Sequence, residues 1–522
     1  MLPKMKLDNR QHNFPLNSST GKWTLLSTIL PSSMAFIDST ALNVILPSLQ
    51  RDLGASGTDL FWVLNSYLLM LAALIIVGGG LGDKLGRVKI FKIGIVIFII
   101  GSALCGFSPD IYSLIVFRTV QGIGGAFMIP GSLSIIASVF SREDKGKAIG
   151  TWSAATTIVM ICGPVLGGVL ADIGMWRLIF FINIPLGLVS LYTLHLKVPE
   201  SYEPGARGSK IDWTGATVLV LSLASLTFGL LEMPQLGYTH WIVLTSLILG
   251  IVLMIAFPII ENRTNDPMVP LSIFKNLTFS GVNILSFFLY AGLGAVMLFF
   301  SLNIIQIQGY SQLQAGLTFL PFSVIMVSMA RKMGTLTDKY GARRFLILGP
   351  AITGIGMIWL SEIGMTNGPS DYWTTYFPGF ILFAFGMAIT VVPLTTEVMS
   401  CVDESKSGIA SGINNSVTRI SGTFMNAIAG AMAIYMFTDF VVLNVDLLEL
   451  SGTVKNEIVA QSDKLGDAKA PMEISASMQT AVNDIYKKGF IETYRWISQL
   501  SAALAFISAG VAFFMVKQRS HD

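Results

Sequence analysis

Charge is what this sequence has least of. Only 12% of its 522 residues are Asp, Glu, Lys or Arg, whereas a soluble domain carries roughly 25%. A chain this long and this poor in charge cannot cover itself with a water-facing surface. Its mean hydropathy of +0.66 instead indicates that the lipid bilayer is its solvent.

Cysteine is equally scarce. Cys105, Cys162 and Cys401 lie in or beside apolar runs, and none belongs to a CxxC or Cys/His pattern. We expect each to be a small buried hydrophobe, not half of a disulfide or a metal ligand.

The N-terminal stretch 1–22 is too long and polar for a signal peptide, so the first apolar run is expected to be retained.

Motifs of catalysis and of ATP use are missing as well. The sequence holds no GxxxxGK[ST] phosphate loop, which disfavours ATP-driven transport, and no nucleophile elbow or zinc-protease motif. We therefore expect no enzyme, no cofactor, no metal site and no nucleic-acid partner. The expected partners are a small-molecule substrate, protons and the lipid bilayer, and a membrane fusion protein is left open.

Long apolar runs are what the chain has in abundance. A membrane-spanning helix needs about 20 mostly apolar residues, and fourteen segments qualify. The even number places both termini on one side of the membrane. The predicted spans are 23–46, 58–80, 88–107, 111–138, 146–171, 176–196, 213–233, 239–260, 277–302, 311–330, 344–364, 373–399, 407–437 and 489–516.

The distribution of Lys and Arg predicts which side carries the termini. If both termini are cytoplasmic, 24 Lys and Arg residues lie in or beside the tails and loops of that side, whereas the short outer loops hold only Arg51 and Arg177. Positive residues favour the cytoplasmic side, so we expect both termini there. The segment 438–488 then lies outside, although long loops are weak topology determinants.

A repeated loop predicts how the spans are grouped. "GDKLGRVK" separates spans 2 and 3, and the weaker copy "TDKYGARR" separates spans 10 and 11, with 255 residues between Asp83 and Asp338. This offset leaves room for two helices more than a simple repeat of six-helix halves. The expected parts are an N-terminal tail 1–22, a six-helix bundle 23–196, two inserted helices within 197–276, a second six-helix bundle 277–516 that includes a long outer loop 438–488, and a C-terminal tail 517–522.

Six motifs at the expected positions carry a family resemblance. They are "IDSTALNVILP" (37–47), "GGGLGDKLGRVK" (78–89), "RTVQGIGGA" (118–126), "GPVLGGVL" (163–170), "WRLIFFINIPLG" (176–187) and "DWTG" (212–215). With these motifs the chain resembles the major facilitator superfamily, and within it the 14-helix drug/proton antiporter branch. The resemblance implies an all-α polytopic fold of two six-helix bundles plus two inserted helices.

The resemblance also implies that the repeated loop is a conformational latch between the halves on the cytoplasmic side. The alternative is an ordinary positively charged cytoplasmic loop. Asp83 is expected near the start of the third span, where the helix dipole favours an anion. Ala342 replaces an arginine in the second copy, so that copy is the weaker match. The latch residues are Gly79, Asp83, Gly86, Arg87, Asp338, Gly341 and Arg343.

In the fifth span, small residues four apart allow close helix packing in lipid, and a proline favours a kink. The association of this stretch with antiport comes from the resemblance alone. The residues concerned are Gly163, Pro164, Gly167 and Gly168.

Charges inside spans are costly and usually functional. Asp38 and Arg118 both lie roughly 12–14 Å below the outer face at about 1.5 Å per residue. Burial penalises a charged acid, whereas a neighbouring arginine favours it, so this pair is the candidate for proton coupling. The alternative is a static ion pair. Arg419, Glu397 and Glu232 are candidates for contact with substrate or proton, and the aromatic candidates for a hydrophobic pocket are Trp62, Tyr67, Phe127 and Trp152.

The long segment 438–488 contains one apolar stripe. Ile474, Met478, Val482 and Ile485 have the spacing of one helix face. We expect an amphipathic helix that lies on the outer leaflet or over the exit.

These patterns favour a proton-coupled exporter of hydrophobic, often cationic drugs or toxic compounds, working by alternating access in a bacterial inner or plasma membrane. A dedicated exporter of one endogenous metabolite, lipid or siderophore is the first alternative. A membrane sensor that does not transport is the second, and the intact charged motifs weigh against it.

Overall fold

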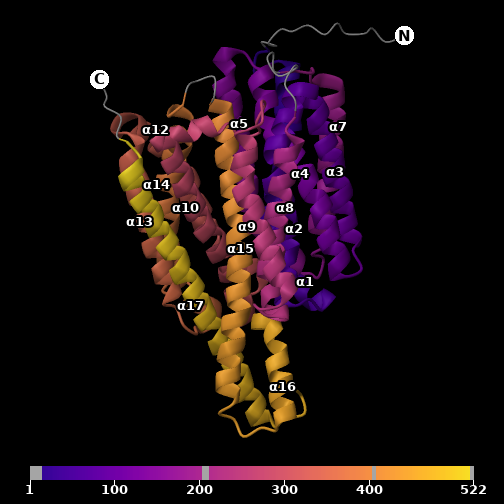
Figure 1. Cartoon of the computed structure of the whole chain (residues 1–522), viewed down its shortest axis with the longest axis vertical. Helices are drawn as coiled ribbons and strands as arrows, with labels where there is room; N and C mark the ends of the chain where they lie inside the picture. Colours follow the sequence, from indigo (N-terminus) through magenta and orange to yellow (C-terminus); the bar gives the residue numbers. More distant parts are fainter. Residues whose placement is uncertain (1–13, 203–210, 403–406, 518–522) are drawn as a thin grey trace.

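The computed structural model describes residues 14–202, 211–402 and 407–517, and the regular structure of these residues is helical (Figure 1). Fourteen helices are long and apolar enough to cross a membrane, which confirms the predicted number and order of spans. Of the expected tails and loops, residues 1–13, 203–210, 403–406 and 518–522 lie outside the described residues.

The helices are α1 (Ser19–Leu53), α2 (Gly57–Leu85), α3 (Arg87–Phe107), α4 (Ile111–Val139), α5 (Arg142–Asp172), α6 (Leu178–Phe181) with α7 (Asn183–Lys197), α8 (Trp213–Leu236), α9 (Trp241–Glu261), α10 (Leu277–Leu302), α11 (Gln312–Thr318) with α12 (Leu320–Tyr340), α13 (Ala342–Ser361), α14 (Tyr376–Ser400), α15 (Ser407–Val445), α16 (Gly452–Ala460) and α17 (Ala476–Met515).

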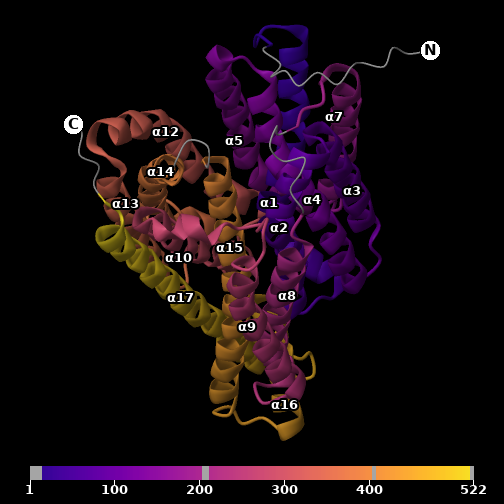
Figure 2. The same cartoon turned by 45° about the horizontal axis from the view of Figure 1, so that its top comes forward.

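The spans form two bundles with an inserted pair of helices against their junction (Figure 2). Helices α1 to α7 make the first bundle, and α10 to α15 with α17 make the second. The inserted helix α8 packs against α2 of one bundle and α15 of the other, while α9 packs mainly on α8. Gly229 of α8 and Gly250 of α9 allow this close approach, because a Cβ at either position would overlap a leucine of the opposite helix.

The two bundles are joined at the end opposite to the start of α1. Gln312 Nε2 donates to Ser48 Oγ at 2.6 Å, and Gln306 Nε2 donates to Gln50 Oε1 at 2.9 Å. The carboxylate of Asp172 also accepts from the backbone N–H of Gln312 at 2.9 Å. Each of these bonds joins α1 or α5 to the segment that follows α10, so this end of the molecule is closed.

At the end that carries the start of α1, helices α5 and α15 have open surroundings. A Cβ at Gly146 or Gly150 of α5, or at Gly412 of α15, would meet nothing within 4 Å in the part of the chain that the structure describes. The contacts of α5 with the second bundle therefore lie mainly at the opposite end, where α5 packs on α11.

The segment expected as a long outer loop, 438–488, is mostly helical. Helix α15 continues to Val445 and α17 already begins at Ala476, so both spans run well past the predicted boundaries and project from the bundles together with α16 (Figure 1). The apolar stripe does lie on a helix, the first part of α17. Val482 is fully buried, and Ile474 and Ile485 pack on the same core cluster. The stripe thus packs on protein and not on the outer leaflet, because α15 and α16 supply its apolar partner.

A short 3-10 helix, η6 (Gln461–Asp467), lies across the junction of the two bundles. The carbonyl of Lys464 accepts a hydrogen bond from Gln50 at the end of α1, and a Cβ at Gly466 would overlap Gln306 of the second bundle. Leu465 is buried with a left-handed φ of 54°, a conformation that costs a residue with a side chain about 1 kcal/mol or more. The segment therefore covers the closed end.

The sidedness of the protein can be tested by labelling single cysteines on intact cells in a cysteine-free variant. Met472 is 94% exposed and lies between η6 and α17, so Met472→Cys should react with an impermeant thiol reagent. Asn17 is exposed before α1, and Asn17→Cys should react only after the cells are opened. The opposite pattern would reverse the orientation predicted from the Lys and Arg distribution. Ser462 lies in the same segment 438–488 but is unsuitable as a labelling site, because it is only 1% exposed.

The prediction of three buried cysteines is right for one. Cys105 is buried in α3, whereas Cys162 is exposed on α5 and Cys401 is half-buried after α14. In a membrane protein an apolar run also covers the surface that faces lipid, so hydrophobicity alone does not indicate burial against protein.

Candidate transport site

Asp38 and Arg118 form a buried ion pair between α1 and α4. Arg118 Nη1 donates to Asp38 Oδ2. Arg118 is 0% exposed and Asp38 is 2% exposed. The sequence placed them at one depth, and the structure brings them into contact although they are 80 residues apart. Removing one partner of a buried pair typically costs 3–5 kcal/mol, since the other charge is left uncompensated.

Gln121 completes the surroundings of the pair, although it was not among the site residues predicted from the sequence. Its Nε2 donates to Asp38 Oδ1 at 3.0 Å, and its Oε1 accepts from Arg118 at 2.7 Å. Further bonds connect Gln121 to Ser102 of α3 and Ser102 to Asn183 of α7. The spacing of Gln121, one helical turn after Arg118 in "RTVQG", was the available signal, because residues three apart share a helix face.

Tyr67 of α2 contacts this pair from the other side. The guanidinium carbon of Arg118 lies 4.3 Å from the centroid of the Tyr67 ring, a distance at which a cation and an aromatic face attract. Tyr67 is 1% exposed, and its hydroxyl has no hydrogen-bond partner among the described residues. The same side chain lines a cavity between the bundles, so one ring touches both the ion pair and the cavity.

The cavity has a volume of about 30 Å³ and receives residues from both bundles. Of the candidates named from sequence, Tyr67, Trp152 and Arg419 line it, and Trp152 is held by a hydrogen bond from its Nε1 to Ser32 Oγ at 3.2 Å. The lining residues are Ser32, Ala35 and Phe36 of α1, Tyr67 of α2, Ile129 of α4, Trp152 of α5 and Arg419 of α15.

Four other candidates do not line this cavity. Trp62 Nε1 donates to Glu232 Oε1 at 2.9 Å, which pairs α2 with the inserted helix α8. Glu397 is 6% exposed near the C-terminal end of α14. Phe127 lines a separate small cavity beside the first loop copy. The aromatic and acidic residues of the spans therefore fall into at least three places, which the sequence could not distinguish.

One face of the glycine motif in α5, formed by Gly163 and Gly167, packs on α1. A Cβ at Gly163 would overlap the hydroxyl of Thr40, and a Cβ at Gly167 would lie 2.8 Å from the carbonyl oxygen of Ala41. Both contacts fall within the helix that carries Asp38. The two glycines therefore let α5 approach α1 directly beside the ion pair.

The second face of this motif packs on the other bundle. A Cβ at Gly168 would overlap the backbone of Gln312, and the carbonyl of Pro164 lies against Gly316 of α11. These contacts belong to the closed end of the molecule. The motif is thus an interface between the halves, a role that the spacing of its glycines allowed but did not specify.

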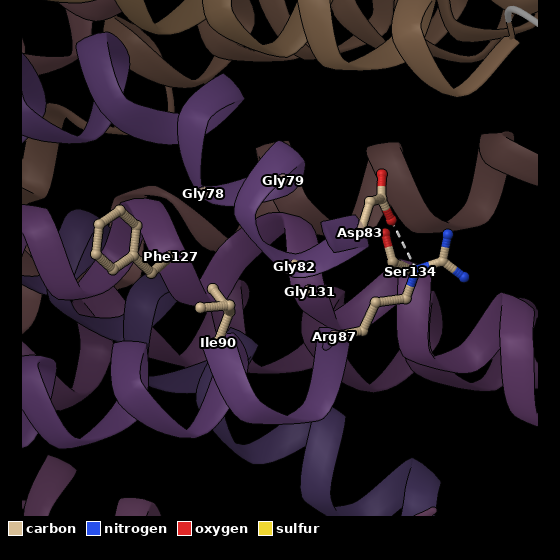
Figure 3. A pocket seen from close by; sticks show the side chains of 9 residues that line it. All are labelled: Gly78, Gly79, Gly82, Asp83, Arg87, Ile90, Phe127, Gly131 and Ser134. Atoms are coloured by element: carbon tan, nitrogen blue, oxygen red, sulfur yellow. Dashed lines mark hydrogen bonds and ion pairs between the residues drawn. The ribbon is translucent and has the colours of Figure 1, made fainter. Parts of the chain in front are cut away.

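The first loop copy contains an ion pair across a helix junction. Arg87, the first residue of α3, donates from Nε to Asp83 Oδ1 in the last turn of α2 at 2.8 Å, and Figure 3 shows the two side chains turned toward each other. Gly86 links the helices with φ of 115°, a conformation that glycine adopts without strain. Gly79 lies one turn earlier in α2, beside Pro130 of α4.

The anion at the start of α3 is Glu200, not Asp83 as expected. Its carboxylate accepts from the backbone N–H groups of Val88 at 2.8 Å and Lys89 at 3.0 Å, where the helix dipole favours negative charge. Asp83 belongs to the end of α2. The distance in sequence between Glu200 and α3 explains why the pattern did not reveal this contact.

The second copy is built differently. Gly341 again links two helices with a positive φ of 77°, but Asp338 is exposed at the end of α12. Arg343 donates to the carbonyl of Phe513 in α17 at 2.7 Å. The copy with Ala342 in place of an arginine therefore ties α13 to α17 and does not reproduce the pair of the first copy.

We predict that Asp83→Asn and Arg87→Gln each reduce export about fivefold with near-normal protein levels, an effect of about 1 kcal/mol. The double variant should lose no more than the larger single loss, because each change removes the same bond. Export rates of the four proteins at equal protein level check this. Losses that multiply in the double variant would show that the two residues act independently.

The fold and the site together define a class. An all-helical chain with fourteen membrane-length helices in two bundles around a central cavity is an integral membrane transporter and not an enzyme. A sequence model of the Major Facilitator Superfamily matches residues 29–426, and the chain belongs to this family.

Relatives within the family carry names of resistance proteins. The chain is 31% identical to the multidrug resistance protein Stp of Mycobacterium tuberculosis over 412 residues, which is 78% of this chain and 75% of that protein. It is 31% identical to multidrug resistance protein 3 of Bacillus subtilis over 80% of each chain. It is 26% identical to the tetracenomycin C resistance and export protein of Streptomyces glaucescens over 95% of this chain and 91% of that one.

Solved structures share the fold. A bacterial homolog of the human lysosomal transporter Spinster, in an inward-facing and occupied conformation, superimposes with a TM-score of 0.65 at 18% identity, covering 97% of this chain and 100% of that chain. The D-xylose-proton symporter gives a TM-score of 0.59 at 16% identity, with 96% and 99% covered. These identities support the shared fold alone.

Proposed function

We propose that this protein is a proton-coupled antiporter that exports small hydrophobic compounds by alternating access. The buried Asp38–Arg118 pair carries this proposal, because Tyr67 touches both the pair and the central cavity. A protonation change at Asp38 can therefore alter the position of Tyr67, and with it the shape of the cavity. The names of the relatives support export of toxic compounds.

In the proposed cycle Asp38 is the proton carrier and Arg118 its electrostatic partner. Burial away from water favours the neutral acid, whereas the guanidinium favours the carboxylate. Gln121 can hydrogen-bond to either the neutral acid or the carboxylate of Asp38, since its amide both donates and accepts. When Asp38 takes a proton, Arg118 loses its counter-charge, and the remaining acceptors are Gln121 and the carbonyl of Val63. That change is the proposed link between the proton and the arrangement of the bundles.

Alternating access requires contacts that open and close at each end. The contacts of α5 with α11 and of α1 with the segment after α10 are the proposed outer gate. The Asp83–Arg87 pair is the proposed latch of the inner end, where the second bundle would approach when that end closes. We place the protein in a bacterial inner or plasma membrane with both termini cytoplasmic.

Reconstituted vesicles test the proposal. Proteoliposomes with an imposed pH difference should move a hydrophobic substrate against its gradient, and a protonophore should stop this movement. A panel of compounds then separates multidrug export from export of one endogenous metabolite, lipid or siderophore. Uphill movement that persists without a pH difference would refute proton coupling, and the absence of any flux would favour the sensor alternative.

A further inference from the structure

The Arg419 side chain has no hydrogen-bond or ion-pair partner among the described residues. It lies in mid-span on α15 and lines the central cavity, and within the described residues its guanidinium forms no hydrogen bond and no ion pair. Charged side chains in a membrane interior are normally paired or face a site where something else supplies the counter-charge. The half-buried guanidinium can therefore bind an anion or another oxygen acceptor that enters the cavity.

The rest of the lining specifies the shape of the occupant. Phe36, Tyr67 and Trp152 present aromatic rings from three helices of the first bundle, and Arg419 reaches the cavity from the second. Aromatic side chains bind flat apolar rings, and a guanidinium binds carboxylates and other oxygen anions through several directed N–H groups.

The lining contains no acid that could bind a cation. The seven residues that line the cavity include one charged residue, Arg419. Asp38 is held by Arg118 and Gln121, and Glu232 is held by Trp62. A cationic compound in the cavity would meet a like charge in a medium of low dielectric constant, where repulsion is strong.

We propose that this cavity, which must widen from its volume of about 30 Å³ to admit a substrate, selects aromatic compounds that carry an anionic oxygen group, with Arg419 as the residue that binds this group. This inference rests on the proposed export function for its biological meaning, and it replaces the expectation of often cationic substrates. Arg419 pairs with the oxygen group, while the rings of Phe36, Tyr67 and Trp152 hold the aromatic part. Because the two kinds of contact come from different bundles, such a compound would connect the halves.

Binding of three matched probes tests the inference. They are 2-naphthoate, 2-naphthamide and 2-naphthyltrimethylammonium, which share one ring system and differ in charge. Equilibrium dialysis against the full chain in zwitterionic nanodiscs, with empty nanodiscs subtracted, gives three affinities. We expect 2-naphthoate to bind most tightly and the cation most weakly. Either a cation that binds best or equal binding of all three would overturn the inference.

Variants at Arg419 sharpen this test. Arg419→Gln should weaken 2-naphthoate at least about tenfold, which corresponds to about 1.4 kcal/mol, and change 2-naphthamide by no more than about twofold. The affinity of Arg419→Lys for 2-naphthoate should lie between those of the unchanged protein and Arg419→Gln, since lysine keeps the charge but loses the planar geometry. Arg331→Gln removes an exposed arginine from α12 of the same bundle and should leave all affinities unchanged. Unchanged 2-naphthoate affinity in Arg419→Gln would refute the assigned role.

The binding measurement is independent of proton coupling. It uses no pH difference and no vesicle interior, so a protein that binds as expected but fails to pump would refute the proposed antiport and keep the substrate class. A protein that pumps but prefers the cation would refute the substrate class and keep the antiport.

Discussion

Asp38→Asn is expected to abolish uphill, proton-driven export, with a rate at least about 100-fold below that of the unchanged protein, while the protein remains in the membrane. Asparagine has nearly the volume of aspartate but cannot titrate. Its single amide oxygen can still accept one of the two bonds that the carboxylate accepts from Arg118 and Gln121, and Arg118 keeps Gln121 and the carbonyl of Val63 as acceptors. The buried contacts are therefore largely preserved while the proton site is lost. Downhill movement of substrate should persist, because the pathway is not blocked.

The measurement is efflux against a gradient in vesicles with an imposed pH difference, at equal protein level. Asp439→Asn is the matched control, since it removes an exposed acid from α15 and should leave the rate unchanged. Arg118→Ala should also lose coupling, because Asp38 then loses the guanidinium that it pairs with. A normal rate in Asp38→Asn would make Asp38 structural, and Glu397 and Glu232 would be the next acids to test.

Gly168→Leu is expected to reduce export at least about fivefold by preventing closure of the end at which α5 packs on α11, the proposed outer gate. Even a Cβ at this position would overlap the backbone of Gln312, and backbone cannot move aside as a flexible side chain can. Overpacking of this kind costs roughly 1–3 kcal/mol, which shifts a balanced conformational equilibrium by about 5-fold to 150-fold. Because the clash lies between the halves and not within one, each bundle should still fold.

Cross-linking reports this closure directly. Ser48 and Gln312 are hydrogen-bonded across the halves, so a short thiol cross-linker should join Ser48→Cys to Gln312→Cys in a cysteine-free protein. Adding Gly168→Leu should lower the yield in parallel with export. Gly510→Leu is the control, because a Cβ there meets nothing within 4 Å among the described residues of the chain. An unchanged cross-link yield with lost export would show that Gly168 does not act through the outer gate.

Several features of the site followed from the sequence because they depend on local composition. An apolar run of membrane length must be a helix, since lipid offers no partners for the backbone, and the fourteen spans follow from this rule. A charge inside such a run stands out against its neighbours, which is how Asp38, Arg118 and Arg419 were found. The run 438–488 was misjudged for the same reason. Its polar composition suggested a loop, but Val482 and its neighbours fold against α15 and α16 outside the bundles.

The tertiary structure alone decided which of these charges has a partner. In a membrane helix, the sides that face lipid and the sides that face protein are both apolar, so periodicity does not reveal the direction of a side chain. Glu200 at the start of α3 and Gln312 beside Ser48 are far from their partners in the chain, and only the packed bundles bring them together. The sequence determined that Asp38, Arg118 and Arg419 lie within the membrane. The fold determined that Arg118 satisfies Asp38, while Arg419 faces the cavity without a partner among the described residues, because helix rotation and packing set what each charge meets.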